Sequence, residues 1–90
     1  MKNKEVITAF LNRQKAKTLN LHTKQDNEKF VLINYETPIA YIQDNDLWID
    51  KCKYSATTSK IQNELISQAT RSNYTILYYN QNKVNKKGGR

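Results

Sequence analysis

Glycine is missing from the first 87 residues of this chain, whose two glycines are Gly88 and Gly89. A phosphate-binding glycine-rich loop and a dinucleotide-binding fingerprint both need glycines where the backbone approaches the ligand closely. Neither type of site is therefore available before Gly88. The chain also has a single histidine and a single cysteine, which are too few for a closed zinc site.

The remaining reactive side chains do not form a convincing catalytic pattern. His22 and Cys52 can in principle pair as base and nucleophile, but both fall in segments with strand character, where structural roles are commoner. Asp44, Asp46 and Asp50 form a spaced acidic cluster without the turn glycine and the final glutamate of a calcium-binding EF-hand loop. We therefore expect no catalytic residue, no bound metal and no cofactor, and we expect that the protein is not an enzyme.

Long apolar runs are also lacking. No stretch approaches the roughly 18 apolar residues that span a membrane, and the apolar segment after Met1 is too short and too polar for a signal peptide. The lone Cys52 cannot form an internal disulfide. These features predict an intracellular protein with no membrane contact.

Positive charge is abundant and unevenly distributed. The net charge is +7: residues 1–17 carry five cations and one acid, residues 18–50 carry two cations and six acids, and residues 51–90 carry eight cations and one acid. Basic clusters attract polyanions, of which nucleic acid is the commonest inside a cell. A solvated surface with a basic tail is the alternative explanation.

Hydrophobic periodicity predicts one small α+β domain over residues 1–79, followed by a mobile basic tail over residues 80–90. Apolar residues recur with helical spacing just after the N-terminus. Alternating and continuous apolar segments then predict an antiparallel sheet of four or five short strands. A helix over residues 59–71, with Ile61, Leu65 and Ala69 facing the sheet, precedes the last strand.

A run of hydroxyl side chains lies at the start of this helix. Ser59 and Gln62 fit a capping box, in which the serine accepts a helix N–H and the glutamine reaches back. The free N–H groups, the hydroxyls and Lys60 would also suit a phosphate, so a cap and an anion site both remain open. The candidate nucleic-acid or anion-binding residues are Lys15, Lys17, Lys51, Lys53, Ser55, Thr57, Thr58, Ser59 and Lys60.

The chain is rich in tyrosine, with six tyrosines and one tryptophan. Aromatic side chains on a sheet face, interleaved with Lys51, Lys53 and Lys60, would suit the stacking of single-stranded bases. The same side chains can instead form the core and its rim.

Two segments of the chain resemble a family of small phage and prophage proteins. Tyr35 to Ala40 follows a Tyr-x-Thr-x-Ile-Ala pattern, and Tyr54 to Lys60 follows a Tyr-Ser-x-Thr-Thr-Ser-Lys pattern; weaker similarity extends over residues 5–70. Ile61 stands where many members have a histidine, so no role of that histidine carries over. The family is largely of unknown function, so the resemblance implies phage origin without a settled biochemistry. Small phage proteins of this kind often modify host machinery or block host defences such as CRISPR systems.

The expected function is that of a small, non-enzymatic phage accessory protein in the cytoplasm of the infected bacterial host. It would act on nucleic acid or on a host nucleoprotein complex, as an anti-CRISPR-like inhibitor does. The alternative is a protein–protein inhibitor of a host defence or replication protein, without nucleic-acid contact. DNA or RNA as the ligand and the oligomeric state remain open.

Overall fold

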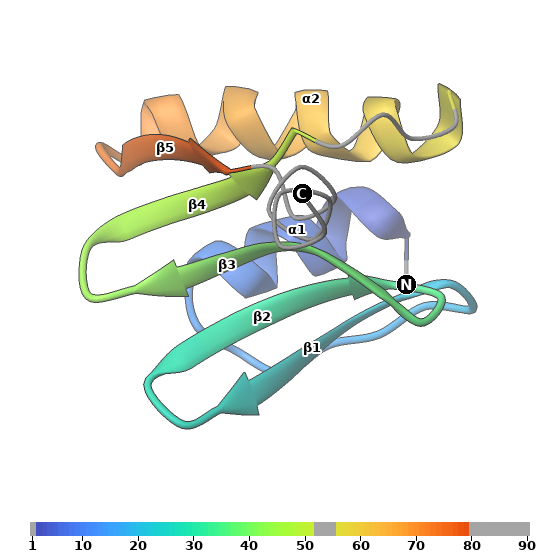
Figure 1. The fold of residues 1–90 in the computed structure, drawn as a ribbon. Coiled ribbons are helices and arrows are strands. Elements are labelled where there is room, and N and C mark those ends of the chain that lie inside the picture. Colours follow the sequence, from blue (N-terminus) through green and yellow to red (C-terminus); the bar gives the residue numbers. More distant parts are fainter. Residues whose placement is uncertain (1, 52–55, 80–90) are drawn as a thin grey trace, which may run out of the picture.

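The structure is a computed structural model that describes residues 2–51 and 56–79. Its elements follow the order α1 (Asn3–Leu11), β1 (Leu21–Asp26), β2 (Lys29–Asn34), β3 (Thr37–Gln43), β4 (Asp46–Asp50), α2 (Ala56–Arg71) and β5 (Thr75–Tyr79). The strands form one sheet in the order β1-β2-β3-β4-β5, and the helices lie beside it (Figure 1). The predicted α+β fold, with a helix before the last strand, is confirmed.

The sheet departs from the prediction in one pairing. Strands β1 to β4 pair antiparallel, but β5 pairs with β4 in parallel. The helix α2 connects these two strands, and a crossover helix returns the chain to the end at which β4 began. The sheet is therefore mixed, whereas the sequence analysis expected antiparallel pairing throughout.

Short turns connect the antiparallel strands without glycine. Asn27, Tyr35 and Asp44 each follow a strand and each adopt a positive φ, between 56° and 58°. Asn and Asp tolerate this left-handed conformation better than most residues. Asn27 and Asp44 thus substitute for glycine in their turns, whereas Tyr35 adopts the same conformation without that tolerance.

The hydrophobic core lies between the two helices and one face of the sheet. Alternate strand residues point to this face, and the ring of Phe10 in α1 stacks on that of Phe30 in β2 with centroids 5.7 Å apart. The predicted core residues of α2 are confirmed, because Ile61, Leu65 and Ala69 are all buried. Residues 80–90, predicted to be a mobile tail, lie outside the described residues.

Replacing Leu65 tests how strongly α2 is held to the sheet. Leu65 is fully buried, so Leu65→Ala should lower the free energy of unfolding by about 2–5 kcal/mol through lost apolar contact and the cavity left behind. Urea unfolding followed by circular dichroism measures this loss. Ser67→Ala, at an exposed position of the same helix, is the control and should change stability by less than about 0.5 kcal/mol. Equal stabilities of the two variants would contradict the packing of α2.

Candidate nucleic-acid interface

Both helices begin at the same end of the sheet (Figure 1). The Thr18 hydroxyl, just before β1, donates to Asn3 Oδ1 at the start of α1 over 2.7 Å. Asn34, at the end of β2, donates from Nδ2 to Thr58 Oγ1 in the first turn of α2 over 2.9 Å. Asn20 joins the two contacts: its Nδ2 donates to Asn34 Oδ1 over 2.9 Å, and its backbone N–H donates to Thr18 Oγ1 over 3.3 Å. The positive ends of two helix dipoles are therefore held at one end of the domain.

Five exposed lysines belong to the segments that meet at this end. We call this surface the lysine-rich end; it comprises Lys2, Lys4, Lys17, Lys51 and Lys60. Lys4 of α1 and Lys60 of α2 line one hollow together with Asn3, Ile61 and Glu64. Lys51 follows β4, and its Nζ lies 4.8 Å from the centre of the Tyr78 ring. Segments that are far apart in the sequence thus contribute to one basic surface.

The acidic residues are divided between the two ends. Glu5 and Glu64 lie near the lysine-rich end, but each accepts a hydrogen bond, from Lys2 N over 2.8 Å and from Gln68 Nε2 over 2.9 Å respectively. Glu36 lies exposed in the turn after β2. The turns at the opposite end of the sheet carry Asp26, Glu28, Asp44 and Asp46. Asp50 ends β4 at the lysine-rich end and is fully buried. The opposite end has cations of its own, Arg13, Lys29 and Arg71. The lysine-rich end is therefore distinguished by lysines from separate segments that gather beside the N-termini of both helices.

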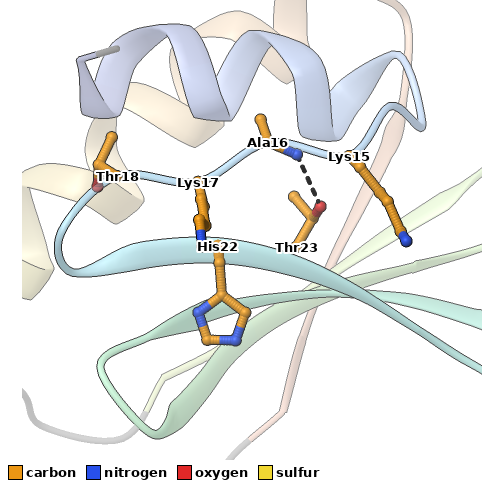
Figure 2. Close-up of a pocket in the computed structure, with 6 residues that line it drawn as sticks. All are labelled: Lys15, Ala16, Lys17, Thr18, His22 and Thr23. Atoms are coloured by element: carbon orange, nitrogen blue, oxygen red, sulfur yellow. Dashed lines mark hydrogen bonds between the residues drawn. The ribbon is translucent and has the colours of Figure 1, made fainter.

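Lys15 and Lys17 lie on the segment that runs beside β1 (Figure 2). The Ala16 N–H donates to Thr23 Oγ1 over 3.2 Å, and Lys17 forms an isolated bridge with His22. These residues line a hollow of about 510 Å³, with the His22 ring directed away from α1. Of the predicted cations, Lys17, Lys51 and Lys60 therefore share one end, whereas Lys15 lies further along the β1 edge and Lys53 lies outside the described residues.

The capping role predicted for Ser59 is wrong. Helix α2 begins at Ala56, so Ser59 is already inside the helix. Gln62 does not reach back to Ser59; its Nε2 donates to Asp50 O over 2.8 Å and to Ile39 O over 3.3 Å. The Gln62 side chain therefore hydrogen-bonds backbone carbonyls of β3 and β4 instead of capping its own helix. The local sequence pattern does not show that these carbonyls lie within reach.

The other described hydroxyl residues of the run differ in burial. Thr58 is buried and accepts the bond from Asn34, so its hydroxyl supports the fold. Ser59 and Lys60 are exposed. Ser55 lies outside the described residues, as does the side chain of Thr57. Among the described hydroxyls of the run, Ser59 is thus the one that solvent reaches.

The second notable surface is the side of the sheet opposite the core, which we call the helix-free face. Neither α1 nor α2 packs on it. The register aligns one residue from each strand across this face: Lys24, Val31, Tyr41, Trp48 and Leu77. Side chains directly opposite each other on neighbouring strands share a face.

Three half-buried aromatic rings cluster on the helix-free face. The ring of Tyr41 stacks on that of Trp48 with centroids 6.1 Å apart, and it lies 5.6 Å from that of Tyr79 in a tilted arrangement. Lys29 Nζ lies 4.6 Å from the centre of the Tyr41 ring, a cation–π contact. Aromatic side chains near lysines were expected from the sequence, but the grouping of these three rings and the contact with Lys29 were not.

The environment of this cluster shifts the titration of two tyrosines. Burial raises the pKa of Tyr41 above its ordinary value. Burial, followed by the negative charges of Asp50 and Tyr41, raises the pKa of Tyr79 from 10.0 to about 12. Both phenols are neutral at physiological pH, so the cluster presents uncharged rings.

Residues 2–51 and 56–79 offer neither a metal site nor a membrane-spanning helix. No group of three or more His, Cys, Asp or Glu side chains there is placed to hold a metal ion. Over the same ranges, neither helix has both the length and the apolar character needed to cross a membrane. The chemistry that the described surfaces offer is that of lysines and aromatic rings.

Comparison with known proteins places the chain in a family without assigning an activity. The matching family is described as "Family of unknown function (DUF8033)", and the match covers residues 5–81. The chain belongs to this family. No curated protein and no solved structure matches the chain significantly.

Two neighbouring substitutions distinguish the buried hydroxyl from the exposed one. Thr58→Val keeps the side-chain shape but removes the acceptor of Asn34 Nδ2, and it should cost about 1–3 kcal/mol of unfolding free energy. Ser59→Ala should change stability by less than about 0.5 kcal/mol, because Ser59 is an exposed helical residue. Urea unfolding of both variants is the measurement, and a larger loss for Ser59→Ala would restore the capping interpretation.

The raised pKa of Tyr79 predicts a loss of stability in alkali. Because the folded-state pKa lies above the unfolded value, the contribution of Tyr79 is complete below pH 10 and is lost as the pH rises towards about 12. Unfolding free energies measured across this range should fall less steeply for Tyr79→Phe than for the wild type. Identical pH profiles would show that the Tyr79 phenol is not perturbed by folding.

Proposed function

We propose that this member of the family is a non-enzymatic protein that binds nucleic acid, free or within a nucleoprotein complex. The observation that carries the proposal is the lysine-rich end, where five exposed lysines and the N-termini of both helices come together. Lysine side chains and helix N-termini are the groups that contact phosphate oxygens in complexes with nucleic acids. The uneven charge of the whole chain supports the same conclusion.

The biological setting is part of the proposal. The resemblance to small phage proteins supports a phage accessory role in the cytoplasm of an infected bacterium. There the protein would interfere with a host nucleoprotein complex, as counter-defence inhibitors of CRISPR systems do. A basic surface on a small domain suits this task, because it can bind the nucleic acid and so compete with the host complex for it.

Neutralising part of the lysine-rich end should weaken binding and reduce its salt dependence. Each phosphate contact that is removed should lower the slope of log affinity against log salt by about one. The double variant Lys51→Gln/Lys60→Gln should therefore lose about two units of slope. Fluorescence polarisation of labelled single- and double-stranded DNA and RNA at several salt concentrations measures affinity and slope together.

Arg71→Gln is the matched control, because Arg71 is an exposed cation at the opposite end of α2 from Lys60. It should leave the salt slope close to that of the wild type. Equal slopes for the wild type and the double variant would remove the lysine-rich end from the interface. Absence of binding to every probe at ~50 mM salt, where phosphate contacts are strong, would contradict the proposed function.

A protein–protein inhibitor is the second candidate, and one observation favours it. Leu19 is completely exposed, at 104%, and Tyr35 is 68% exposed. The two residues lie on neighbouring loops, because the Tyr35 N–H donates to the Asn20 carbonyl. Neighbouring exposed apolar side chains, rather than a single one, are the feature that marks a protein contact. Retention of a host protein by the wild type but not by Leu19→Ser, from nuclease-treated lysate, would favour this candidate.

A further inference from the structure

We infer that the helix-free face binds unpaired bases, so that single-stranded nucleic acid is the form the protein recognises. This inference rests on the proposed function and specifies its ligand. The rings of Tyr41, Trp48 and Tyr79 form one connected cluster that crosses three neighbouring strands, β3, β4 and β5. These rings contribute nothing to the core between the helices and the sheet.

Ring stacking selects single strands because every base exposes a π-face only when it is unpaired. Aromatic side chains on a sheet bind such bases with little sequence preference. In a duplex the bases are stacked on one another, and the phosphates alone are offered to a flat surface. The lysine-rich end therefore accounts for polyanion binding, and the rings add the preference for unpaired bases.

The two surfaces meet at the end of the sheet where β5 ends. Tyr79 ends β5, and its carbonyl accepts a hydrogen bond from the Lys51 N–H over 2.6 Å. The Lys51 Nζ lies over the Tyr78 ring, on the opposite face of β5, so Lys51 can contact a bound strand only where that strand passes the end of the sheet. Lys29, over the Tyr41 ring, supplies a further cation on the face.

The acidic residues of the helix-free face constrain the path of the bound strand. Asp26 lies opposite Lys29 in the register, and Asp46 lies at the turn end of β4. Asp50, opposite Tyr79, is fully buried. Asp26 and Asp46 thus lie towards the turns, away from Tyr79, and the favoured path runs from Lys29 and the Tyr41 ring towards Tyr79.

The chain provides its own probe, because Trp48 is the sole tryptophan. Its fluorescence is titrated with three probes of equal length: a single-stranded oligothymidylate, an abasic single strand and a duplex. We expect the oligothymidylate to quench the fluorescence and to bind more tightly than the other two. The abasic strand should bind through its phosphates with little quenching.

A pair of adjacent residues supplies the matched variants. Tyr79→Leu removes a ring from the helix-free face, whereas Tyr78→Leu removes the same type of ring from the opposite face of the same strand. Tyr79→Leu should weaken oligothymidylate binding by about tenfold, the effect of losing one stacked base. It should leave the affinity for the abasic strand unchanged. Tyr78→Leu should retain the preference for the oligothymidylate.

The outcomes separate this inference from the proposed function. Equal affinities for the oligothymidylate and the abasic strand, without quenching, would overturn base stacking while leaving the lysine-rich end as a polyanion site. A preference for the duplex would overturn it as well. Failure of all three probes to bind would overturn both. If circular dichroism shows that Tyr79→Leu does not fold, the quenching and the probe preference of the wild type still decide whether bases stack on the rings.

Discussion

The position of both helix starts at one end of the sheet depends on a chain of hydrogen bonds that runs from Asn3 to Thr58. Its central member is Asn34, which is 6% exposed, accepts a bond from Asn20 and donates one to Thr58. A buried amide left unpaired costs more than the bond itself contributes. The start of α2 and the loop before β1 are therefore held against the end of β2, and Thr18 extends the same restraint to α1.

This restraint has an electrostatic consequence. Helix dipoles that point the same way add their positive ends, and the lysines nearest those ends come from four separate segments of the chain. Repulsion among them opposes folding, and the buried contacts of Phe10, Leu65 and their neighbours outweigh it.

The two faces of the sheet have different chemistry because strand residues alternate in direction. In β3 and β4, Ile42 and Leu47 enter the core, while the adjacent Tyr41 and Trp48 form the ring cluster on the other face. The same strands thus stabilise the domain and present its second candidate surface. Substitutions on the helix-free face can consequently alter binding without opening a cavity in the core.

Local patterns were enough to predict the types of element and the buried side of α2, because helical and strand periodicities are read over a few neighbouring residues. The absence of glycine before Gly88, the single histidine and the lone cysteine likewise limited the possible chemistry from composition alone. The start of α2 was misplaced, because Ser59 has every local feature of a cap, and the helix nevertheless begins at Ala56. The parallel pairing of β5, the meeting of both helix starts, and the gathering of Tyr41, Trp48 and Tyr79 are contacts between distant segments. Only the tertiary structure decided them, because no local periodicity records which strand edges and which helix ends will meet.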